Sequence, residues 1–124
     1  MSSLPLVKRA LVFTLCAASC AFALAQSNPV GRFQVQGRNP DGSSYGGTAQ
    51  ISWISNTTCR ITWNTGGTVR GICMRSGSAF AASYVMGGEA GLAIYEIKPD
   101  GSLDGSWTIA GQSGGGGERL VPTR

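Results

Sequence analysis

Turn-forming residues limit the possible folds of this chain more than any other feature, because they recur so often that only short segments remain between them. Clusters of Gly, Pro, Asn, Asp and Ser bound a succession of segments in which apolar and polar residues alternate. Alternation of this kind is typical of β-strands with one buried face. No stretch of residues 26–124 shows a sustained apolar period of about 3.6, so we expect no helix there.

Eight such segments predict eight strands. Their expected bounds are Gly31–Gly37, Gly47–Ile54, Thr58–Asn64, Thr68–Met74, Ala79–Val85, Gly91–Ile97, Leu103–Ile109 and Glu118–Val121. Short strands in chain order can bury one face by closing into an up-and-down barrel or by splitting into a β-sandwich. We favour an all-β, eight-stranded antiparallel up-and-down barrel, because closure leaves no exposed edge strand. Its interior is expected to be either filled by side chains or large enough for one small ligand.

One turn phrase occurs twice, at Asn39–Gly42 and at Lys98–Gly101, and both copies read x-P-D-G. Pro fixes φ at the second position of a type I turn, Asp suits the third, and Gly accepts a positive φ at the fourth. We therefore interpret both copies as hairpin corners. A catalytic role for Asp41 or Asp100 is disfavoured, because a carboxylate at a turn tip is solvated.

The middle hairpin predicts a disulfide. If Thr65–Gly67 is a three-residue turn, residues whose numbers sum to 132 lie opposite one another, so Cys59 faces Cys73. Both cysteines then share the core-facing side of the hairpin with Ile61 and Trp63. The bond would close a loop of roughly 15 residues and contribute about 3 kcal/mol to stability.

The N-terminal residues predict export. Lys8 and Arg9 precede an uncharged apolar run from Ala10 to Leu24, and residues 23–25 read A-L-A, a small-x-small cleavage site. The run is shorter than the roughly 20 residues that a membrane-spanning helix requires. We therefore expect residues 1–25 to be a signal peptide and residues 26–124 to form one domain with no membrane span.

The cysteines agree with export to the periplasm or beyond the cell. Cleavage would remove Cys16 and Cys20 and leave Cys59 and Cys73 as one pair, which is typical of a disulfide in an oxidising compartment. An alternative is lipid attachment at Cys20, where A-A-S-C loosely resembles a bacterial lipobox. The apolar run continues beyond that cysteine, which disfavours the alternative.

Charge and the absence of histidine exclude several function classes. The expected domain carries eight basic and six acidic residues, with the basic ones scattered singly, which disfavours nucleic acid as a partner. Without histidine the usual general base and the commonest metal ligand are missing. Glu96 with Asp104 is the remaining candidate carboxylate pair, but a strand glutamate usually faces solvent. We expect no enzyme, no metal and no cofactor.

Aromatic side chains are the remaining candidates for recognition. Most of them fall on expected core faces, as Trp63 and Trp107 do. Tyr45 and Trp53 are less constrained, and an aromatic residue at a barrel mouth or on an outer face can mark a binding site. We take Tyr45 and Trp53 as the candidate binding surface.

Four motifs give the chain a resemblance to a known group of proteins. They are G-x-x-x-V-x-G-x-N-P-D-G-S from Gly31, I-x-W from Ile51, I-Y-x-I-x-P-D-G-x-L-x-G-x-W from Ile94, and G-x-E-x-L-x-P from Gly116 to Pro122. The chain thereby resembles small exported proteobacterial proteins, some of which carry the name fibronectin-binding protein. The resemblance implies a shared fold and points to surface adhesion.

These observations favour an exported, monomeric, non-enzymatic β-barrel binding module whose partner is a host or envelope protein or a small apolar ligand. A periplasmic protease inhibitor is an alternative, since small inhibitors of secreted metalloproteases resemble the chain in size, single disulfide and barrel. Those inhibitors insert an extended N-terminal segment into the enzyme. Here only Gln26–Val30 precedes the first expected strand.

Overall fold

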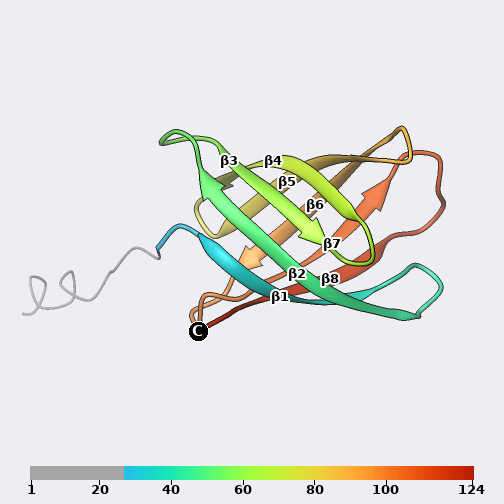
Figure 1. Ribbon diagram of the computed structural model, residues 1–124, viewed down its shortest axis with the longest axis horizontal. Coiled ribbons are helices and arrows are strands. Elements are labelled where there is room, and N and C mark those ends of the chain that lie inside the picture. Colours follow the sequence, from blue (N-terminus) through green and yellow to red (C-terminus); the bar gives the residue numbers. More distant parts are fainter. Residues whose placement is uncertain (1–26) are drawn as a thin grey trace, which may run out of the picture.

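The computed structural model describes residues 27–124, which form a closed barrel of eight antiparallel strands (Figure 1). The strands are β1 (Gly31–Arg38), β2 (Ser44–Trp53), β3 (Cys59–Asn64), β4 (Thr68–Ser76), β5 (Ala79–Met86), β6 (Glu89–Ile97), β7 (Leu103–Ile109) and β8 (Gly116–Pro122). Each strand pairs with its neighbours in the chain, and β1 pairs with β8 to close the barrel. The up-and-down barrel is thus confirmed, and the sandwich is not formed. Residues 27–124 contain no helix.

Alternate residues of each strand point into the barrel, as the sequence pattern predicts. On β6, for example, Ala93, Tyr95 and Ile97 are buried, whereas Leu92 and Ile94 are exposed. The largest side chains with less than 2% exposure are Phe33, Phe80, Ile51, Ile61, Leu103, Leu120, Cys59 and Ser102. The core is therefore the barrel interior itself.

The predicted disulfide is present on the predicted face. Cys59 pairs with Cys73 across β3 and β4, with a Cα–Cα distance of 4.9 Å, and both side chains are buried. The Thr65 amide donates to the Gly67 carbonyl over 3.1 Å, which closes the three-residue turn that sets this register.

The two x-P-D-G phrases form matching corners, one between β1 and β2 and the other between β6 and β7. Gly42 and Gly101 have φ values of 91° and 86°, and each donates its amide to the carbonyl three residues earlier over 2.9 Å. Asp41 Oδ1 accepts from the amide and hydroxyl of Ser43 over 2.9 and 2.6 Å. Asp100 binds Ser102 over the same distances. Both copies of the x-P-D-G motif therefore form hairpin turns, as predicted.

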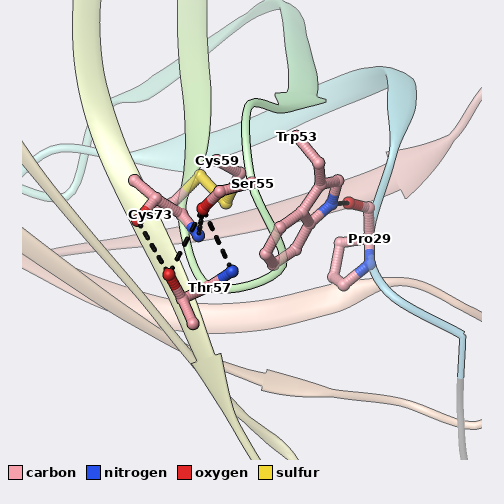
Figure 2. Close-up of a disulfide and its surroundings, with 7 residues drawn as sticks. Pro29, Trp53, Ser55, Thr57, Cys59 and Cys73 are labelled. Carbon is pink, nitrogen blue, oxygen red and sulfur yellow. Dashed lines mark hydrogen bonds between the residues drawn. A yellow bond between two sulfur atoms is a disulfide. The ribbon is translucent and has the colours of Figure 1, made fainter.

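The barrel has two unlike ends. We call the end with the β2–β3, β4–β5 and β6–β7 loops the closed end, because residues 27–30 cross it. There Pro29 is buried, and its carbonyl accepts a 2.7 Å hydrogen bond from the Trp53 indole (Figure 2). The disulfide lies beside this contact (Figure 2). We call the opposite end, with the β1–β2, β3–β4, β5–β6 and β7–β8 loops, the open end.

The expected signal peptide and Cys20 lie outside the described residues. Within residues 27–124, no helix has the length and hydropathy needed to cross a membrane.

Candidate functional site

A cavity of about 300 Å³ occupies the half of the barrel interior nearer the open end. Its wall combines turn residues with inward-facing strand residues, most of them aromatic. The lining residues are Asn39, Tyr45, Trp63, Thr65, Val69, Tyr84, Met86, Ala93, Tyr95, Trp107 and Glu118. Side chains therefore fill the barrel interior near the closed end. Near the open end they leave a cavity large enough for a small ligand.

Glu118 is the one charged residue in this wall, and it is 7% exposed. Its Oε1 accepts a hydrogen bond from the Tyr45 hydroxyl over 2.8 Å. Its Oε2 accepts from the Trp63 indole over 3.0 Å and from the Tyr95 hydroxyl over 2.5 Å. The donors come from β2, β3 and β6, so the carboxylate on β8 joins distant parts of the barrel.

The environment keeps the tyrosines protonated. Burial first, and then the negative charge of Glu118, raise the pKa of Tyr84 to about 12. The same two causes raise the pKa values of Tyr45 and Tyr95 well above their ordinary value. All three side chains therefore remain neutral phenols, able to donate hydrogen bonds, over the whole physiological pH range.

Glycines position three of the rings. Each ring lies over the glycine directly opposite on a neighbouring strand, in the pairs Tyr45–Gly37, Tyr84–Gly91 and Trp107–Gly116. A Cβ atom at Gly37 would stand 2.0 Å from Cζ of Tyr45, so only glycine leaves room for the ring. These pairs explain part of the high glycine content of the chain.

The rings also contact one another. Tyr45 and Trp107 meet edge to face with centroids 6.4 Å apart, and Trp63 and Tyr84 do so at 5.5 Å. The Tyr84 hydroxyl donates to the Thr108 carbonyl over 2.9 Å. The indole N–H of Trp107 is buried and makes no hydrogen bond of normal geometry with the described residues. This N–H lies beside the Tyr45 hydroxyl, whose pKa it lowers slightly against the larger effects that raise it.

The structure places the two residues of the predicted binding surface at opposite ends of β2. Tyr45 pairs with Gly37 and lines the cavity, whereas Trp53 pairs with Cys59 and packs at the closed end. Both side chains are half-buried. They therefore do not form one surface, and only Tyr45 belongs to the cavity.

The predicted carboxylate pair lies outside the barrel. Glu96 and Asp104 are opposite each other on β6 and β7, and both are exposed. The Glu96 carboxylate accepts from Lys98 Nζ over 3.2 Å. Asp104 borders an open groove beside Arg119, and Glu96 is not among the residues that line it.

Sequence reasoning missed Glu118, which it placed at the first position of the last expected strand. The signal was available in the alternation of β8, since Glu118 has the same parity as Leu120, which is fully buried. Glu118 is also the acidic residue of the G-x-E-x-L-x-P motif. Weighing this residue as an inward-facing strand residue would have identified it.

An apolar patch lies on the outer face of β4, β5 and β6. It consists of side chains that are between 55% and 63% exposed, namely Ile72, Met74, Val85, Leu92 and Ile94. Register places Ser83 between Ile72 and Leu92, and Ala81 between Met74 and Ile94, so these apolar side chains lie on one face of three adjacent strands. We call it the outer apolar face.

No protein-family model matches the chain, and no curated protein is significantly similar to it in sequence. Solved structures with the same fold include a de novo designed fluorescence-activating β-barrel, with a TM-score of 0.62 and 17% identity. That match covers 76% of this chain and 93% of the designed chain.

Two natural barrels are similar at lower scores. A mutant of the fluorescent protein UnaG has a TM-score of 0.52 and 12% identity, covering 77% of this chain and 96% of its own. A Schistosoma mansoni fatty acid binding protein in complex with arachidonic acid has a TM-score of 0.52 and 10% identity. It covers 82% of this chain and 100% of its own. At such identities the likeness establishes the fold alone.

Proposed function

We propose that this protein is a non-enzymatic binding module that holds one small ligand in the open-end cavity. The observation that carries the proposal is the cavity itself, a space of about 300 Å³ at one end of an otherwise solid barrel. Sites for small molecules are concave, mostly apolar and supplied with a few fixed polar groups. The aromatic wall and Glu118 match that description.

The fold neighbours support this proposal. One of them is a fatty acid binding protein in complex with arachidonic acid, and another was designed to activate fluorescence. The same architecture therefore accommodates small ligands in other chains. The two exposed carboxylates Glu96 and Asp104 offer no comparable site for catalysis.

The three tryptophans provide the test. Trp63 and Trp107 line the cavity, whereas Trp53 lies at the closed end and serves as an internal control. Titration of ¹⁵N-labelled protein with 2-phenylethanol, a small neutral aromatic probe, should shift the indole resonances of Trp63 and Trp107. The resonance of Trp53 should stay in place.

A matched pair of substitutions locates the binding. Ala93→Phe places a ring in the cavity from β6, and we expect it to weaken binding by about tenfold or more. Ala90→Phe adds the same ring to the exposed face of the same strand and should leave binding unchanged. Shifts that persist in Ala93→Phe, or that include Trp53 equally, contradict the proposal.

We further propose that the protein acts in the periplasm or outside the cell, after cleavage behind Ala25. The disulfide supports this location, because such bonds persist in oxidising compartments. Intact mass measurement of the protein from a periplasmic fraction should give a chain that begins at Gln26 and has no free thiol. A chain that retains residues 1–25 in that fraction contradicts the location.

Adhesion to a host or envelope protein is a second candidate, favoured by the outer apolar face. Exposed apolar surface of this kind often marks contact with another protein. Substituting Leu92 and Ile94 by Lys should then reduce capture of fibronectin by the immobilised protein. Substituting the exposed Gln34 and Gln50 by Lys adds the same charge elsewhere and should have no effect. Equal capture by both variants contradicts a role for this face.

The protease-inhibitor alternative gains no support from the N-terminal segment. Pro29 is buried, and Asn28 Oδ1 accepts a 3.1 Å hydrogen bond from Arg75 Nη1. The described part of this segment therefore lies against the barrel.

A further inference from the structure

The cavity contains a buried acid without a cation. The two ion pairs among the described residues, Lys98–Glu96 and Arg119–Asp100, both lie on the surface. No Lys or Arg lines the cavity. A buried charge is costly unless a partner compensates it, and neutral donors compensate it less completely than an ion does. Glu118 therefore gives the cavity an unbalanced negative charge.

The hydrogen bonds of Glu118 leave room for one more donor. A carboxylate offers about four acceptor positions, and the three aromatic donors occupy one on Oε1 and two on Oε2. By this count the remaining acceptor position is on Oε1, and a ligand N–H that reached it would displace none of the existing bonds.

The surrounding rings favour the same ligand charge. Five aromatic side chains line a cavity of about 300 Å³, and two of them are tryptophans. Aromatic faces attract cations, and the indole face attracts them most strongly. The rings and the carboxylate thus act in the same direction on a positively charged group.

An anionic ligand is correspondingly disfavoured. The fatty acid binding protein among the fold neighbours is in complex with arachidonic acid, a carboxylate. In this chain a second carboxylate in the cavity would meet Glu118, and two like charges in a poorly solvated site repel strongly. We therefore expect the cavity of this chain to disfavour a carboxylate ligand.

We propose that the open-end cavity selects small organic ammonium ions with an apolar or aromatic body, the ammonium group binding Glu118 Oε1 among the rings. This inference rests on the proposed ligand-binding function and adds the chemical class of the ligand. Residues 27–124 contain no group of three or more Cys, Asp or Glu side chains that could hold a metal ion.

A series of three probes tests the inference on the unaltered protein. The probes are 2-phenylethylammonium, the neutral 2-phenylethanol and the anionic 3-phenylpropanoate, which share an aromatic body and differ in charge. Affinities come from the indole resonances of Trp63 and Trp107, with Trp53 as the internal control. We expect the ammonium ion to bind about tenfold or more tightly than the alcohol, and the carboxylate to bind most weakly.

Two substitutions assign the preference to one residue. Glu118→Gln keeps the size of the side chain and removes its charge, so the ammonium ion should lose about tenfold or more in affinity. The alcohol should change by less than about threefold, because its binding does not depend on that charge. Glu96→Gln removes one negative charge from the outer surface and should alter neither affinity.

The outcomes separate this inference from the proposed function. If all three probes bind the cavity equally, and Ala93→Phe blocks them, the ligand-binding function stands and the charge preference is wrong. If no probe moves the cavity indoles at concentrations up to its solubility limit, both are wrong. A Glu118→Gln variant that does not fold leaves the series on the unaltered protein as the decisive comparison.

Discussion

The two halves of the barrel interior follow the same strand alternation and differ in the residues that it points inward. Near the closed end these residues are apolar, such as Phe33, Phe80 and Leu103, each at most 2% exposed. Near the open end most of them are Tyr or Trp, together with Glu118, and these carry hydrogen-bonding groups around a cavity. The closed half therefore contributes chiefly apolar burial, whereas the open half also leaves polar groups facing a cavity.

The largest expected effect concerns the apolar half. Phe80 is fully buried, and Phe80→Ala should lower the free energy of unfolding by about 3–5 kcal/mol through lost burial and the cavity left behind. Met86→Ala truncates a residue at the rim of the open-end cavity that is 44% exposed, and should cost less than about 1 kcal/mol. Urea unfolding measures both values. Equal costs would break the contrast between the halves.

The disulfide also stabilises the closed half. Replacing both Cys59 and Cys73 by Ser should lower the free energy of unfolding by about 3 kcal/mol, since the bond closes a loop with a sequence separation of 14. The melting temperature by circular dichroism measures the loss. A reducing agent should destabilise the unaltered protein and leave the double variant unchanged. A double variant as stable as the parent protein would show that the disulfide does not stabilise the fold.

A smaller effect is expected where a hydroxyl group is removed from the open half. Tyr84→Phe deletes the 2.9 Å hydrogen bond to the Thr108 carbonyl and should cost about 1 kcal/mol in urea unfolding. The ring over Gly91 remains, so the packing of the wall is kept. A cost comparable to that of Phe80→Ala would show that the open half contributes as much stability as the closed half.

The smallest effect concerns the two turns outside both halves. Hydrogen bonds from Ser43 and Ser102 lower the pKa values of Asp41 and Asp100, whose ordinary value is 3.8. A lowered folded-state pKa means that the carboxylates stabilise the fold above that value and lose this contribution as the pH falls through the lowered pKa.

Replacing both aspartates by Asn should therefore flatten the acid dependence of stability. The measurement is the difference in urea midpoint between about pH 7 and about pH 3, which should be smaller in the double variant than in the parent protein. An unchanged difference would exclude these two turns as a source of acid sensitivity.

The fold could be predicted from the sequence because its determinants are local. Turn residues limit each strand, alternation assigns its faces, and the three-residue turn at Thr65–Gly67 sets the register that joins Cys59 to Cys73. The strand bounds accordingly differ from the expected ones by only a few residues, as β2 shows by beginning at Ser44 instead of Gly47.

The site was harder to predict because it is not local. The donors to Glu118 come from three strands, and only barrel closure brings them together. Tyr45 was selected as an aromatic near a barrel mouth and lines the cavity, in a position that depends on Gly37 leaving space beneath the ring. Trp53 followed from the same reasoning and lies instead against Pro29 at the closed end.

Every tyrosine of this protein lies in one cavity around a buried carboxylate. The chain has three tyrosines, and burial together with Glu118 raises the pKa of each, to about 12 in the case of Tyr84. Because these pKa values exceed the ordinary value of 10.0, the protonated phenols stabilise the fold below pH 10.0. That contribution is lost as the pH rises through the raised values.

The most direct test is therefore an alkaline titration that follows phenolate absorbance immediately after a pH jump, before unfolding. We expect almost no phenolate in the folded protein near pH 10.0, the ordinary pKa of tyrosine, with the first ionisation near 12 and full titration only on unfolding. Glu118→Gln should move these ionisations part of the way toward the ordinary value. A folded protein in which even one tyrosine titrates near 10.0 would contradict the cavity as described.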